Sequence, residues 1–167
     1  MDKNNFFIKS QIQSNIRSIA QLIDTGVFNA DVLNIFREPV FVSIILKFNN
    51  LLQKFSQLEN RIVFKDDISV GDIDITELIR RVRNAIGHLD SNENMLNDES
   101  QCKFVFNVVS GKMQNAFVIN GKSYGSDYED DIAVFYGEYR IYLKRHIVKA
   151  FQESVVIAKR LYPDSRI

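Results

Sequence analysis

The hydrophobic positions of this chain change their period partway along the sequence. Apolar residues recur every three to four positions in the first half, and this spacing predicts helices at about 5–24, 29–36, 39–58 and 75–89. Between about 102 and 136, short runs rich in Phe and Val are separated by turns that contain Gly, which is typical of β-hairpins. Helical spacing returns over about 138–162. The start of this last helix could instead be a strand, because YRIYL at 139–143 also alternates between apolar and polar residues.

The order of these elements predicts an α+β, mainly α fold. We expect a helical bundle with a small antiparallel β-sheet inserted before the last long helix. Residues 61–73 are predicted as a connection with at most one short strand, and 91–101 as a polar loop. With 167 residues and no repeats or linkers, the chain is expected to form one domain, 1–167.

Composition does not change the predicted fold, but it indicates the cellular compartment. The chain is 46% hydrophobic and 25% charged, which is ordinary for a globular protein. The N-terminus resembles no signal peptide, and no apolar run is long enough to span a membrane, so we expect a cytoplasmic protein without a membrane partner. Cys102 is the only cysteine and cannot form an internal disulfide, which fits a reducing compartment. We expect it to be a small buried residue where a strand starts.

Three clusters of polar residues have ordinary interpretations. Gly121-Lys122-Ser123 is predicted to belong to a hairpin, because Ala116 stands where a phosphate-binding loop requires Gly. The acidic segment Asp127–Asp131 lacks the spacing of a calcium loop and is expected to be a solvated loop. In the last helix, Arg145 and Lys149 lie one turn apart beside His146 and form either a solvated face or a contact to phosphates. We expect no metal and no cofactor.

The helix predicted at 75–89 carries the most informative pattern. Asp74 can cap its start, with Glu77 three residues later completing a capping box. One face is an apolar stripe formed by Ile75, Leu78, Ile79, Val82, Ile86 and Leu89. The opposite face carries the polar and small residues Arg80, Arg83, Asn84, Gly87 and His88. Such a helix packs against a core and presents a cationic face to solvent.

Arg83 and His88 on this face are suited to RNA cleavage. A histidine exchanges protons near neutral pH and can remove the proton of a ribose 2′-hydroxyl, while a guanidinium stabilises the charge that develops on the phosphate. Asn84 can orient the His88 ring or bind a phosphate. On an ideal helix Arg83 and His88 lie about 140° apart around the axis and about 7.5 Å apart along it. The alternative is an exposed arginine and a histidine favoured by the helix dipole.

The segment Arg83-Asn84-Ala85-Ile86-Gly87-His88 resembles the motif of the HEPN superfamily, in which arginine is followed, after four to six residues, by histidine. The resemblance implies a helical bundle that dimerises through the motif helix, so that two Arg–His sets form one cleft. It further implies a metal-independent endoribonuclease of a toxin–antitoxin, phage-defence or RNA-processing system. Arg83 and His88 would be catalytic and Asn84 supportive. The insert at about 102–136 is not part of the minimal bundle.

Two classes of function therefore remain open. The first is a homodimeric RNase that leaves a 2′,3′-cyclic phosphate, with Arg80 and Arg81, and further along Arg145 and Lys149, as contacts to RNA phosphates. The second is a non-catalytic module that dimerises or binds RNA or a nucleotide, for example as the partner of an antitoxin or a nucleotidyltransferase. The net charge of zero favours the second class, because no extended basic surface is expected.

Overall fold

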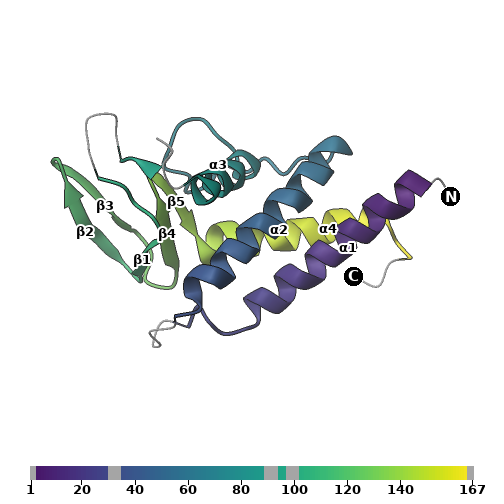
Figure 1. The fold of residues 1–167 in the computed structure, drawn as a ribbon, viewed down its shortest axis with the longest axis horizontal. Coiled ribbons are helices and arrows are strands. Elements are labelled where there is room, and N and C mark those ends of the chain that lie inside the picture. The colour runs from purple at the N-terminus through teal and green to yellow at the C-terminus, as the bar shows by residue number, and fades with distance from the viewer. Residues whose placement is uncertain (1–2, 30–34, 89–93, 97–101, 165–167) are drawn as a thin grey trace.

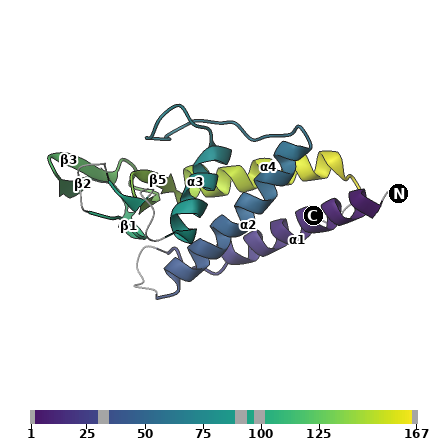
Figure 2. The same cartoon turned by 45° about the horizontal axis from the view of Figure 1, so that its top comes forward.

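The computed structural model describes residues 3–29, 35–88, 94–96 and 102–164. Three helices precede the strands and one follows them: α1 (Lys3–Ile23), α2 (Arg37–Gln57), α3 (Ile75–Gly87) and α4 (Lys149–Leu161). The predicted α+β, mainly α fold is confirmed. Figures 1 and 2 show α1, α2 and α4 lying lengthwise, with the strands at one end and the start of α1 and the end of α4 at the other.

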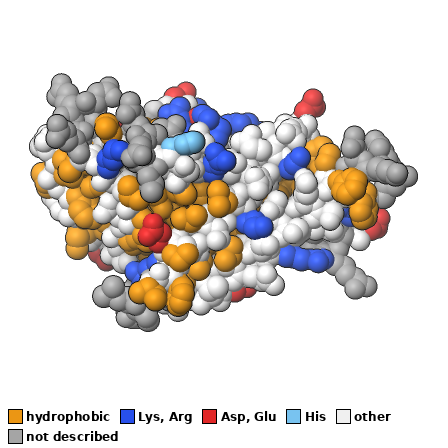
Figure 3. Space-filling view, viewed as in Figure 1, with side chains coloured by type: hydrophobic (Ala, Val, Ile, Leu, Met, Phe, Trp, Pro, Cys, Tyr) orange, Lys and Arg blue, Asp and Glu red, His pale blue; other side chains and the backbone are white. Residues whose placement is uncertain are grey.

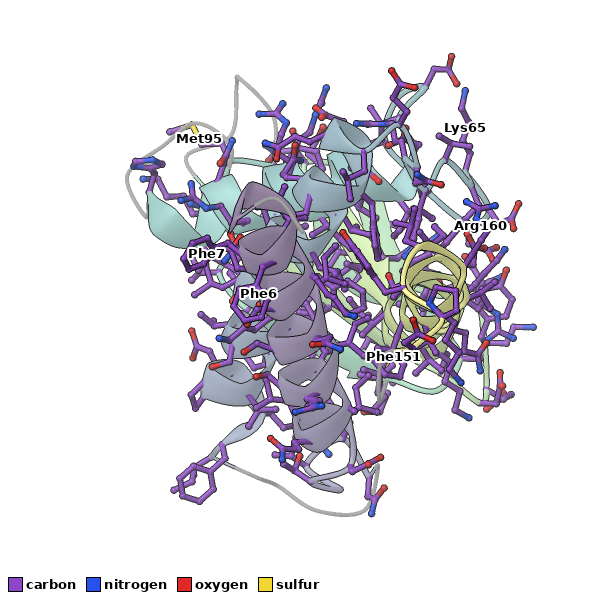
Figure 4. The ribbon with its side chains drawn as sticks, turned by 90° about the vertical axis from the view of Figure 1, so that its right-hand side faces the viewer. Phe6, Phe7, Lys65, Met95, Phe151 and Arg160 are labelled. Carbon is purple, nitrogen blue, oxygen red and sulfur yellow. The ribbon has the colours of Figure 1, made fainter. Side chains whose placement is uncertain are left out.

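The helices are held together by one apolar core. α1 packs on α2 and α4, and α2 packs on α3. The helices bury most of the residues whose spacing predicted them, among them Ile12, Ile19, Phe48, Leu51, Phe55 and Ile79, each 0% exposed, but not Phe6 and Phe7, which are exposed. Figure 4 shows Phe151 between α4 and α1, whereas Phe6 and Phe7 lie on the outer side of α1.

Five strands form two antiparallel sheets. The larger sheet has the order β1-β4-β5, with β1 (Asn107–Ser110), β4 (Ile132–Tyr136) and β5 (Tyr139–Tyr142). The smaller sheet is the hairpin of β2 (Met113–Ile119) and β3 (Lys122–Ser126). Its two-residue turn is Asn120-Gly121, with φ of 52° and 76°, as in a type I′ turn. The hairpin interpretation of Gly121-Lys122-Ser123 is therefore confirmed.

Strand β4 is buried on both faces and connects the sheets to the bundle. Val134 and Tyr136 belong to the core that the helices form. Ala133 and Phe135 belong to a second apolar cluster, together with Tyr124 of β3. The larger sheet thus has helices on one face and the β2–β3 hairpin against the other.

The predicted start of the last helix is wrong. Gly137, with φ of 56°, and Glu138 form a two-residue turn that returns the chain as β5, so the strand alternation of YRIYL prevails over its helical spacing. Ile141 faces the main core and Tyr142 the second cluster. A π-helix, η2 (Leu143–Val148), follows and leads into α4. The buried carboxylate of Asp131 caps it by accepting hydrogen bonds from the backbone N–H groups of Lys144 (2.8 Å) and Arg145 (3.1 Å).

Other differences are smaller. Strand β1 starts at Asn107 rather than at Cys102, and Cys102 is exposed rather than buried. The predicted helix at 29–36 falls largely on residues outside the described part, and residues 35–36 form a turn. Within the predicted loop at 91–101, Leu96 is buried in the second cluster. Among the helices that the structure describes, none is both long and apolar enough to cross a membrane.

Candidate nucleic-acid site on helix α3

The start of α3 is fixed by its cap. Asp74 accepts a hydrogen bond from the backbone N–H of Glu77 at 2.8 Å, as predicted, and Arg61 binds the same carboxylate through Nε (2.7 Å) and Nη2 (2.8 Å). The second bond of a capping box, from the backbone N–H of Asp74 to the Glu77 carboxylate, is absent from the described contacts. The Glu77 carboxylate binds arginines instead. Asp74 thus fixes the helix start and leaves Glu77 to order the cations on the exposed face.

The end of α3 is fixed by Asn94, a residue that the sequence did not single out. Its amide nitrogen donates to the backbone oxygens of Ala85 and His88, both at 2.9 Å, and the residue is 0% exposed. These bonds satisfy carbonyls that a helix leaves unpaired at its C-terminus. Asn94 lies within the predicted polar loop, and its carbonyl accepts a hydrogen bond from the backbone N–H of Phe104 at 2.9 Å, a contact with a segment that follows that loop. It positions the backbone of His88.

The apolar stripe of α3 is buried and its opposite face is open. Val82 and Ala85 are buried, and Ile86 is partly exposed at the border. Arg83, Gly87 and His88 are exposed, and Asn84 is half-buried. Figure 3 shows Lys, Arg and His side chains gathered over α3. The amphipathic arrangement predicted for this helix is therefore confirmed over 75–87, where α3 ends two residues earlier than predicted, and Leu89 of the predicted stripe lies outside the described residues.

The motif residues differ from an ideal helix at its end. His88 is the residue after the helix, with φ of −136° and ψ of 77°, so its side chain does not continue the helical path. The guanidinium of Arg83 donates from Nη1 to Oδ1 of Asn84 at 3.2 Å. Asn84 therefore binds Arg83 rather than orienting the His88 ring through its side chain. The backbone N–H of His88 donates to the Asn84 carbonyl at 3.0 Å.

The neighbouring arginines are paired with one carboxylate. Glu77 binds Arg80 through two bonds (2.8 and 2.7 Å) and Arg81 Nε at 2.8 Å. The hydrogen bond from Arg80 is the main reason that the pKa of Glu77 falls to about 2. Arg81 also lies 3.5 Å from the Tyr139 hydroxyl, which ties α3 to β5. In contrast, no carboxylate among the described residues pairs with Arg83.

The basic residues predicted near the last helix lie in a different setting. Arg145 binds Asp131 and Asp130, each at 3.0 Å, and its guanidinium stacks 3.5 Å above the Tyr128 ring. Lys149 pairs with Asp66. No described contact joins either residue to Arg83 or His88, so their assignment as phosphate contacts stays a prediction.

His146, which lies beside these basic residues in the sequence, is buried. It is 0% exposed, its Nδ1 accepts from the backbone N–H of Tyr142 at 3.0 Å, and its Nε2 lies 2.9 Å from the Asp66 carbonyl. Nδ1 accepts a hydrogen bond and so carries no proton, whereas Nε2 donates to the carbonyl and carries one; the ring is therefore neutral. Burial lowers its pKa. It joins the segment before α3 to η2, and this structural role explains it.

The described cavities lie away from the motif. One, of about 430 Å³, lies between α1 and α2 and is lined by amide and hydroxyl side chains such as Gln11, Asn15 and Gln53. Another, of about 290 Å³, includes Asp130 and Asp131. Within the described ranges, no three His, Cys, Asp or Glu side chains are grouped to hold a metal ion.

Comparison of the chain with protein-family models, with curated proteins and with solved structures gave no match.

Proposed function

We propose that the chain is a HEPN-type, metal-independent endoribonuclease whose site forms where two copies meet at α3. The observation that carries this proposal is the contrast among the cations of one helix. Arg80 and Arg81 share Glu77, whereas Arg83 has no carboxylate partner among the described residues and donates to the neutral amide of Asn84. An exposed guanidinium of this kind matches phosphate oxygens. His88 lies exposed at the end of the same helix.

The reaction assigns one role to each side chain. His88 removes the proton of a ribose 2′-hydroxyl, and the 2′-oxygen forms a bond to phosphorus while the bond from phosphorus to the 5′-oxygen breaks. The products are a 2′,3′-cyclic phosphate and a 5′-hydroxyl. Arg83 stabilises the charge on the phosphate oxygens in the transition state. Arg80 and Arg81 are secondary contacts to the phosphates that flank the cleaved bond.

A second copy of the chain completes this chemistry. The leaving 5′-oxygen must receive a proton, so the reaction uses an acid as well as a base. The chain has two histidines, and His146 is fully buried, so the exposed histidine available for the second role is His88 of another copy. A twofold axis beside α3 would bring the two together and supply a second wall to an otherwise open face. Such an enzyme would act in the cytoplasm.

The proposal is tested by incubating RNA with the wild type and with His88→Ala in EDTA. We expect the substitution to lower the cleavage rate by about 100-fold or more, because one proton-transfer group is removed. Lys159→Ala, which removes an exposed cation from α4, is the control and should cleave normally. Circular dichroism checks that each variant is folded. Undiminished cleavage by His88→Ala, or loss of wild-type cleavage in EDTA, would contradict the proposal.

A second candidate function is RNA or nucleotide binding without cleavage, in partnership with an antitoxin or a nucleotidyltransferase. It is favoured by the His88 ring, which has no hydrogen-bond partner among the described residues, whereas a general base is commonly oriented by one. In that case RNA binds with an affinity that depends on Arg83, and no cleavage is detected in the wild type. The same assay, read for binding as well as for cleavage, separates the two functions.

A further inference from the structure

A small cavity of about 120 Å³ lies between the β2–β3 hairpin and the larger sheet, apart from the motif face of α3. Side chains of β3, the β4–β5 turn, β5 and the segment before α3 line it. The polar ones are Ser69, Lys122, Ser123, Glu138 and Arg140, and the rings of Tyr124 and Phe135 form its apolar wall. Residues distant in sequence thus bring two cations and two hydroxyls to one small space.

Arg140 is held in place and has a buried N–H group without an acceptor among the described residues. Its Nη1 donates to the Gly125 carbonyl at 2.9 Å and pairs with Asp127 at 2.9 Å, and its guanidinium lies 4.9 Å from the centre of the Tyr142 ring. Its Nε is buried and has no hydrogen-bond partner. A buried N–H without an acceptor is unfavourable, and most such groups in proteins are paired. Arg140 lines the cavity, so a ligand bound there would lie beside a fixed cation that has an unsatisfied N–H group.

Lys122 adds further donors. Its ammonium lies 2.6 Å from Glu138 and 5.4 Å from the centre of the Tyr124 ring. The hydrogen bond to Glu138 raises the pKa of Lys122, so the group stays charged at neutral pH. An ammonium has three N–H groups and Glu138 accepts one of them. The hydroxyls of Ser69 and Ser123 have no hydrogen bonds to other described residues.

The polar groups of the lining are thus mostly donors. Glu138 is the one carboxylate among the lining residues, and Lys122 already binds it. A ligand that complements this lining is rich in acceptors, and the cavity is of a size for a single tetrahedral oxyanion rather than a whole nucleotide. We propose that this cavity binds a phosphate group. Lys122 and Ser123 would act here through their side chains on a hairpin, not through the backbone of a phosphate-binding loop before a helix.

The phosphate can come from two sources. Free inorganic phosphate would bind through the residues of the cavity alone. A phosphodiester of RNA would connect the cavity with α3, because Tyr139, next to Glu138, lies 3.5 Å from Arg81. Only this second source rests on the proposed function.

Amide and Arg Nε–H signals, followed by NMR while inorganic phosphate is added, test the proposal. We expect the Arg140 Nε–H and the amides of 122–125 to shift with saturation. Lys122→Gln should weaken binding about tenfold, because it removes a charge-assisted hydrogen bond. Glu138→Gln should tighten binding severalfold, because it removes the competing carboxylate, and a gain of affinity cannot result from misfolding. Lys112→Gln, on the exposed β1–β2 connection outside the cavity, is the matched control.

The proposal is overturned if the Arg140 Nε–H signal does not move, or if Lys122→Gln and Lys112→Gln weaken binding equally. A short RNA without terminal phosphates then distinguishes the sources. If it shifts the same signals, the ligand is a phosphodiester, and if inorganic phosphate alone shifts them, the ligand is free phosphate. Failure of the nuclease proposal would appear in His88→Ala, which leaves this cavity intact.

Discussion

The guanidinium of Arg83 donates to the side-chain oxygen of Asn84 at 3.2 Å, so two consecutive residues of the motif form a pair on the exposed side of α3. An amide holds the guanidinium without neutralising it. Glu77, by contrast, holds Arg80 and Arg81 with a negative charge. The type of partner therefore distinguishes the arginine proposed for catalysis from its neighbours.

The first prediction follows from this difference. Asn84→Asp keeps the shape of the side chain but adds a carboxylate beside Arg83, so we expect RNA affinity and cleavage to fall about tenfold or more. Asn84→Ala removes the contact and leaves the charge, so its effect should be much smaller. Asn115→Asp, on an exposed position of β2, controls for the added negative charge. Equal effects of Asp and Ala at position 84 would contradict the neutral-partner role.

The second prediction concerns Glu77 and acid. Its pKa is about 2 in the folded protein, against an ordinary value of 4.5. A lowered pKa means that the ion pairs stabilise the fold above about pH 4.5 and that this contribution is lost as the pH falls towards 2. Because Arg80 is exposed, we expect Glu77→Gln to lower the free energy of unfolding at pH 7 by only about 1 kcal/mol.

Urea unfolding at pH 7, 5 and 3.5 measures this effect. The difference between wild type and Glu77→Gln should shrink as the pH falls, whereas Glu59→Gln, at an exposed position, should differ little from wild type throughout. A difference that does not depend on pH would show that the carboxylate charge is not what stabilises α3.

The third prediction concerns His146. Burial lowers its pKa below the ordinary 6.5, and Nδ1 already accepts the Tyr142 N–H. His146 therefore takes up a proton more readily in the unfolded chain than in the folded one. The stability that the neutral ring contributes to the fold is lost as the pH falls below about 6.5. The free energy of unfolding should fall by at most about 1.4 kcal/mol per pH unit from this group. His146→Gln should flatten that slope between pH 7 and 5, and ¹⁵N NMR of the wild type should show the proton on Nε2 at pH 7. A proton on Nδ1 would contradict the assignment.

Sequence patterns predicted the amphipathic helices and the Asn120-Gly121 hairpin, because period and turn chemistry act locally. They misplaced the start of the last helix, where YRIYL satisfies both periods and the Gly137 turn decides between them. The exposed face of α3 could be predicted from spacing, but its charge balance could not. That Glu77 binds Arg80 and Arg81 while Asn84 binds Arg83 depends on side-chain conformations. The burial of Asn94 and His146 could not be predicted, because it depends on segments that are distant in sequence.

The fourth prediction concerns Gly87, the last residue of α3. A Cβ added there meets no atom within 4 Å, and its φ lies outside the left-handed region. Gly87→Ala should therefore stabilise the isolated chain by up to about 1 kcal/mol, from helix propensity. If a second α3 approaches this surface, the same substitution should weaken dimerisation. Thermal unfolding and analytical ultracentrifugation measure the two effects.

Gly125→Ala provides the contrast for this experiment. Its Cβ would lie 2.1 Å from the Met113 carbonyl oxygen, so this variant should lose stability. If Gly87→Ala leaves dimerisation unchanged, or if the wild type is monomeric at every concentration, the composite site at α3 is contradicted.

The chemical nature of the RNA ends shows directly whether the 2′-oxygen is the nucleophile in the proposed cleavage. RNA is incubated with the wild type in EDTA, and the products are analysed by mass spectrometry beside the same RNA carrying 2′-O-methyl groups. We expect 2′,3′-cyclic phosphate and 5′-hydroxyl ends from the unmodified RNA and no cleavage of the methylated RNA, because the 2′-oxygen is the nucleophile that His88 activates. Cleavage of the methylated RNA, or products with 5′-phosphate ends, would contradict the claim.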